Sequence, residues 1–144
     1  MKRHLVWISI VLLTFGLYGC ALFTTHYDAL RHQNFTQLKA FHVKFLEDWT
    51  DGSEKTWSAA AVSEACDKGD LKFREASEYA KSKDNKDGTG ARAVSIIWSE
   101  FKDNCKLATS KKISKPASKE LVEEISKNYQ FAIDGELSRV GSPQ

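Results

Sequence analysis

The chain has 144 residues, enough for one domain with a single hydrophobic core. It carries 21 Lys and Arg against 19 Asp and Glu, and two of the basic residues, Lys2 and Arg3, lie at the very start. The 19 basic residues that remain balance the 19 acidic ones, so a basic face that binds nucleic acid is not expected.

The first element is an apolar segment from Leu5 to Tyr18 that follows a basic start at positions 2–4. As a helix it would reach roughly 20 Å, less than the ~30 Å hydrocarbon core of a bilayer. A segment of this length behind a basic start is typical of the apolar core of a secretory signal peptide. No A-x-A-like cleavage site follows it.

The segment ends in Leu17-Tyr18-Gly19-Cys20, which resembles the lipobox of bacterial lipoproteins. The resemblance implies that residues 1–19 are a cleaved signal peptide and that Cys20 becomes the lipidated first residue. Ala21 follows the cysteine where an Asp would retain the protein in the inner membrane, which implies the periplasmic face of the outer membrane. The aromatic-rich segment behind it broadly resembles that of many small proteobacterial lipoproteins, a resemblance that brings no activity with it. The alternative is an uncleaved N-terminal anchor with an unmodified Cys20.

Four segments with helical periodicity follow a short tether at residues 20–25. Apolar residues recur every three or four positions in residues 23–49, 57–81, 91–108 and 116–133. No segment alternates apolar and polar residues in the way that a half-buried strand does. The pattern predicts an all-α fold, a four-helix up-down-up-down bundle over residues 26–135, with residues 136–144 as a flexible tail.

Particular residues within these segments carry further expectations. Asn34 lies in the middle of the first apolar stripe and is expected to be buried. Gly69 leaves open whether the second helix is continuous or kinked, since Gly costs about 1 kcal/mol relative to Ala in a helix. Pro116 suits the first turn of the fourth helix, and Gly135 is expected to be its C-cap.

Cys66 and Cys105 lie on the apolar stripes of the second and third predicted helices, at equal distances from the turn at residues 84–88. Residues symmetric about the turn of an antiparallel hairpin lie level with each other, so the two sulfur atoms are expected to meet. Export would place them in an oxidising compartment, where disulfides persist. The sequence therefore predicts a Cys66–Cys105 disulfide, and two separate buried thiols are the alternative.

The sequence contains no recognisable catalytic or metal-binding motif. The turn at residues 84–90 lacks the ligands of an EF-hand, because Lys83 and Val94 fall where the first and last carboxylates belong. The histidines at positions 26, 32 and 42 are not spaced to share one turn of a helix. No catalytic residue, metal ligand or cofactor is predicted.

These observations favour a membrane-anchored, non-enzymatic helical module that binds another protein of the cell envelope as an adaptor, inhibitor or accessory factor. Because only residues 21–25 separate the lipid on Cys20 from the first helix, the domain is expected to sit against the bilayer. It would then work through its distal links, residues 51–56 and 110–115. The alternatives are a periplasmic stress or chaperone-like protein and a bundle that binds a small ligand or a metal. An exposed aromatic patch at Trp57 or Phe131 would favour the leading interpretation.

Overall fold

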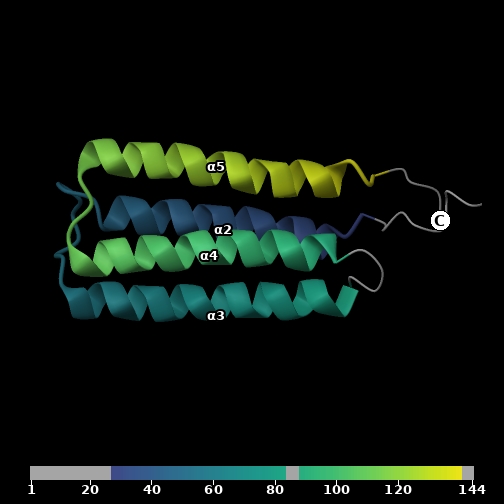
Figure 1. Cartoon of the computed structure of the whole chain (residues 1–144), viewed down its shortest axis with the longest axis horizontal. Helices are drawn as coiled ribbons and strands as arrows, with labels where there is room; N and C mark the ends of the chain where they lie inside the picture. Colours follow the sequence, from purple (N-terminus) through teal and green to yellow (C-terminus); the bar gives the residue numbers. More distant parts are fainter. Residues whose placement is uncertain (1–26, 84–87, 141–144) are drawn as a thin grey trace, which may run out of the picture.

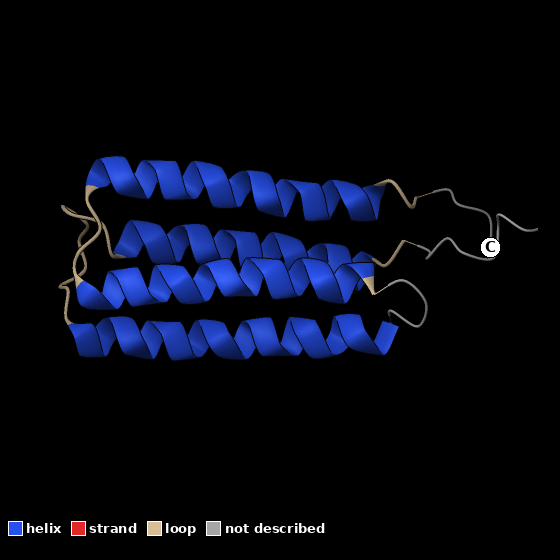
Figure 2. Ribbon diagram, viewed as in Figure 1, coloured by secondary structure: helices blue, strands red, loops and turns tan. Residues whose placement is uncertain are grey.

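The computed structural model describes residues 27–83 and 88–140. These residues form four α-helices and contain no β-strand (Figure 2). The helices are α2 (Ala29–Asp48), α3 (Ala59–Lys83), α4 (Thr89–Ser110) and α5 (Lys115–Leu137). The predicted signal peptide at residues 1–19, Cys20 and the tether at residues 20–25 lie outside the described residues.

The helices lie side by side and alternate in direction along the chain (Figure 1). We call the end where α2 begins the near end; α3 ends there, α4 begins there and α5 ends there. The opposite, far end carries the links between α2 and α3 and between α4 and α5. α3 packs most extensively on α4, and α2 on α5, so the bundle consists of two tight helix pairs. The predicted all-α up-down-up-down bundle is confirmed.

The helix ends follow local capping chemistry. Asp28 is the N-cap of α2, where its side chain accepts hydrogen bonds from the backbone N–H groups of Leu30 and Arg31. Pro116 lies in the first turn of α5, as predicted. The predicted C-cap at Gly135 is wrong, because α5 continues to Leu137. It continues because buried Glu136 lies in its last turn, within the segment that the sequence assigns to a tail.

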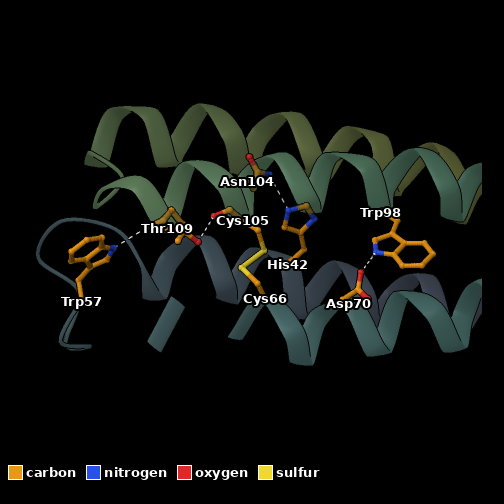
Figure 3. Close-up of a disulfide and its surroundings, with 9 residues drawn as sticks. His42, Trp57, Cys66, Asp70, Trp98, Asn104, Cys105 and Thr109 are labelled. Atoms are coloured by element: carbon orange, nitrogen blue, oxygen red, sulfur yellow. Dashed lines mark hydrogen bonds between the residues drawn. A yellow bond between two sulfur atoms is a disulfide. The ribbon is translucent and has the colours of Figure 1, made fainter. Parts of the chain in front are cut away.

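A disulfide joins α3 to α4 within the first helix pair (Figure 3). Cys66 and Cys105 lie level with each other, with their Cα atoms 5.9 Å apart, and the predicted pairing is confirmed. A cross-link that closes a loop of this length stabilises the folded chain by about 4 kcal/mol in the loop-entropy account. About one turn from Cys66, Asp70 accepts a hydrogen bond of 2.8 Å from Trp98 Nε1, which ties the same two helices again.

The ring of Phe101 lies at the centre of the core. Its centroid is 5.0 Å from that of Phe73 on α3 and 5.2 Å from that of Phe45 on α2. Gly69 lies against the same ring, and a Cβ added there would overlap Phe101 and lie 2.7 Å from Phe41 Cε1. α3 runs through Gly69 without a break. The absence of a side chain at Gly69 leaves the space that the Phe101 ring occupies.

The apolar stripe of α2 departs from its prediction in the first turns. Asn34 is only half-buried, so its predicted burial is wrong, and Leu30 is exposed. Arg31 is buried in their place. The buried amide of the core is instead that of Asn104 on α4.

The two links at the far end are joined to each other. The backbone N–H of Asp51 donates to the carbonyl of Ile113 at 2.8 Å, and the N–H of Ile113 donates to the carbonyl of Trp49 at 3.0 Å. Trp57 is half-buried and its Nε1 donates to the carbonyl of Ala108 at 2.9 Å (Figure 3). Trp57 thus closes the end of the bundle and does not form an exposed aromatic patch.

Substituting Gly69 by Ala tests the close packing of α3 on Phe101. Gly69→Ala is expected to lower the free energy of unfolding by about 1–3 kcal/mol, the usual cost of an overpacked core. Gly135→Ala is the matched control, since Gly135 is also helical but has no atom within 4 Å of an added Cβ. That variant should gain about 0.5–1 kcal/mol from helix propensity. Urea denaturation followed by circular dichroism measures both, and a stabilised Gly69→Ala would contradict the packing account.

Candidate functional site

An apolar groove opens between α4 and α5 toward the near end of the bundle. Its volume is about 350 Å³, at the lower end of the range for small-molecule sites. The groove exists because small residues line the two facing helices: Gly90 and Ala93 on α4, and Ala132 and Gly135 on α5. We call this feature the α4–α5 groove.

Two large apolar side chains form the rim of the groove. Phe131 on α5 is 77% exposed and Ile96 on α4 is 53% exposed. The floor is made by Phe35 of α2 and Ile97 of α4, both of which belong to the core. Of the two aromatic residues at which the sequence would place an exposed patch, Phe131 is therefore exposed and Trp57 is half-buried.

Ionic side chains lie at the near end of the groove. Arg31 Nε is 3.7 Å from Glu136 Oε2, and their side chains are 4% and 2% exposed. Arg139 Nη1 is 3.3 Å from Glu136 Oε1. The Arg31 side chain lies against the backbone of α4, since a Cβ added at Gly90 would be 2.7 Å from Arg31 Nη1. Removing one partner of such a buried pair is strongly destabilising, because it leaves a charge without compensation.

A polar pair lies between α4 and α5 beside the groove. Asn128, which lines the groove, donates a hydrogen bond to Glu100 Oε1. Burial raises the pKa of Glu100, and the nearby carboxylate of Glu124 acts in the same direction, while the bond from Asn128 opposes it. Glu100 is thus more readily protonated than a surface carboxyl.

His42 lies in a sealed network in the middle of the core (Figure 3). With the amide of Asn104 donating to Nε2 at 3.0 Å, the ring proton is on Nδ1, 3.4 Å from the Tyr129 hydroxyl. The rings of Phe101 and Tyr129 meet the imidazole edge-on. Burial lowers the pKa of His42 to about 4, so the ring is neutral at physiological pH. The network fixes how the core side chains pack, and its buried polar groups are out of reach of a substrate.

The predicted site residues are not brought together. Cys20 lies outside the described residues, whereas Cys66 and Cys105 form the disulfide between α3 and α4 and do not line the groove. In residues 27–83 and 88–140, no three His, Cys, Asp or Glu side chains converge in a way that could hold a metal ion. None of the helices in this part of the chain is long and apolar enough to cross a membrane.

Sequence reasoning missed the α4–α5 groove, although two signals for it are present. Phe131 stands off the apolar stripe of its helix, and the small residues Gly90, Ala93, Ala132 and Gly135 fall on facing stripes. Periodicity gives the buried face of each helix, but it does not say which helix pair is separated by small side chains. The buried ionic cluster was missed because Arg31 and Glu136 are residue types that are rarely buried.

The pH dependence of stability tests the environment of His42. Because its pKa falls from an ordinary 6.5 to about 4 on folding, the unfolded chain binds the proton first. Stability contributed by the neutral ring is present above pH 6.5 and is lost as the pH falls toward 4, by about 3 kcal/mol in total. Urea unfolding of the parent and of His42→Gln at several pH values gives the free energy of unfolding of each protein. Subtracting one from the other removes the contribution of the carboxylates, which both proteins share. Identical pH slopes in the two proteins would contradict the buried neutral ring.

A scan against protein-family models finds no match for this chain, and comparisons with curated proteins and with solved structures find none either. The four-helix bundle supports many unrelated activities, so the fold by itself does not identify one. The lipobox resemblance, the α4–α5 groove and the joined links at the far end are the features that bear on function.

Proposed function

We propose that this chain is a membrane-anchored bacterial lipoprotein that acts, without catalysis, as a binding or accessory module in the cell envelope. The lipobox resemblance at Leu17–Cys20 supplies the anchor and the address, the periplasmic face of the outer membrane. The observation that carries the proposal is the gathering of exposed apolar side chains at the near end of the bundle.

Six of the seven large exposed apolar side chains in the described residues belong to this end. Ile96 is about 10 Å from the start of α4, and Phe131 is about 9 Å from the end of α5, at 1.5 Å per residue. Both of those helix ends lie at the near end (Figure 1). The exception is Leu71, halfway along α3. The six residues are Tyr27, Leu30, Ile96, Phe131, Leu137 and Val140.

This distribution suits contact with a lipid surface. Apolar side chains of interfacial proteins are buried about 5–10 Å into the boundary between headgroups and acyl chains, a depth that matches the apolar zone of the near end. Cys20 precedes Tyr27 by seven residues, which span at most about 25 Å when fully extended. A lipid on Cys20 would therefore keep the near end at the bilayer, and α2 would lead away from it.

The far end is then the surface that an envelope protein would meet. Its two links are held to each other by the backbone bonds between Asp51 and Ile113 and between Ile113 and Trp49. One link exposes acidic side chains, Asp51 and Glu54, and the neighbouring one exposes Lys111. A rigid surface with both signs of charge favours a polar, salt-sensitive protein contact.

The two polar groups in the middle of the core are not placed to act as a catalytic acid or base. A general base or acid must come within hydrogen-bond reach of its substrate. His42 and Tyr129, the polar groups at the heart of the bundle, are both fully buried among aromatic rings. They stabilise the core and do not meet a substrate.

The intact mass of the protein extracted from membranes tests the anchor. We expect a chain that begins at acylated Cys20, with no alkylatable thiol before reduction and two after it. Cys20→Ser should remain unprocessed and unacylated, while the paired Cys66→Ser and Cys105→Ser variant should keep the lipid. A full-length, unacylated parent chain would refute the proposed anchor.

Photo-crosslinking in intact cells tests the partner surface. Benzoylphenylalanine in place of Lys111, at the far end, should capture an envelope protein, and added salt should weaken the product. Ser99 is the matched control, because it is exposed in the middle of α4. Equal capture from both positions would count against a partner surface at the far end.

A further inference from the structure

We infer that the α4–α5 groove receives an acyl chain of a phospholipid from the bilayer. The inference rests on the orientation given under the proposed function, in which the near end faces the membrane. It identifies the ligand that the groove takes, whereas the far end remains the surface for a protein.

The groove is continuous with the apolar zone of the near end. Its rim residues, Ile96 and Phe131, are two of the six exposed apolar side chains of that zone. Leu137 and Val140 follow on the same chain segment, closer to the end of the bundle. Seven residues of chain join Tyr27 in this zone to Cys20, so a lipid on Cys20 would be attached within about 25 Å of Tyr27.

The dimensions of the groove favour a hydrocarbon chain over a partner helix. Its lining on α4 runs from Thr89 to Ile97, a length of about 12 Å at 1.5 Å per residue. An α-helix is about 10 Å across with its side chains, so only one face of a partner helix could enter a groove of about 350 Å³. A single acyl chain is much thinner and needs no hydrogen-bonding groups from the small apolar residues that line the walls.

The polar groups lie where the headgroup of such a lipid would be. Arg139, whose side chain is 17% exposed, lies at the near end of the groove beside Glu136, while Arg31 is buried against the same carboxylate. Guanidinium groups suit phosphate oxygens in geometry and charge. The middle of the groove is lined by Ala93, Ala132 and Ile97, which suit a hydrocarbon tail.

Photo-crosslinking in vesicles of phosphatidylethanolamine and phosphatidylglycerol tests the inference. The full-length protein would carry benzoylphenylalanine in place of Phe131, with Leu71 as the matched position, since Leu71 is exposed and apolar but lies away from the near end. We expect an adduct with the mass of one phospholipid, several-fold more abundant from position 131 than from position 71. Equal yields from the two positions, or an adduct with another protein at position 131, would overturn the inference.

Filling the groove gives a second, independent measurement. Ala132→Trp should reduce several-fold the phospholipid adduct formed by benzoylphenylalanine in place of Ile96, with an unchanged circular dichroism spectrum. Ala93→Leu fills part of the groove from the α4 side with a smaller side chain. It replaces Ala132→Trp as the test if the tryptophan disturbs the fold. Undiminished adduct in a folded groove-filling variant would show that the lipid lies elsewhere.

The Cys20→Ser chain separates this inference from the proposed anchor. Added to the same vesicles, it should still give the phospholipid adduct at position 131, because the ligand comes from the bilayer. A crosslink without added mass that disappears in Cys20→Ser would assign the groove to the protein's own acyl chain and refute the inference. An unacylated parent that still forms the adduct would refute the anchor alone.

Discussion

The packing of Phe101 against Gly69 is the contact on which the rest of the bundle depends. Because Gly69 has no side chain, α3 approaches α4 closely enough for the Phe101 ring to lie over its backbone. The same ring then reaches across to Phe45 and His42 on α2, so one side chain joins three helices. The Cys66–Cys105 disulfide holds the register that this contact requires.

The second helix pair adds polar contacts to its apolar and aromatic packing. His42 and Tyr129 meet in the middle of the α2–α5 pair, and Arg31 and Glu136 meet at its near end. Between α4 and α5, the small residues near the near end leave space that neither pair fills. The α4–α5 groove is therefore a consequence of joining two internally well-packed pairs along a seam of small side chains.

Much of this architecture could be predicted from periodicity, and particular residues show where that reasoning ends. The helical periodicity predicted the antiparallel hairpin, and the symmetric placement of Cys66 and Cys105 about its turn, together with the expected export, predicted the disulfide. Arg31 is buried and Asn34 only half-buried, because Arg31 meets an ionic partner on α5, Glu136, that no local pattern reveals. The candidate groove depends on the distance between α4 and α5. The apolar pattern of each helix taken alone does not determine that distance. The predicted anchor at Cys20, by contrast, depends on local sequence alone and lies outside the described residues.

The backbone bonds between the two links join the α2–α3 link to the α4–α5 link at one end of the bundle. They pin α2 and α4, through the residues that follow them, at the far end, whereas the groove lies toward the other end. The α5 residues that line the groove begin at Asn128, beyond the midpoint of that helix. The backbone bonds of the links therefore fix the end of the bundle that the groove does not reach.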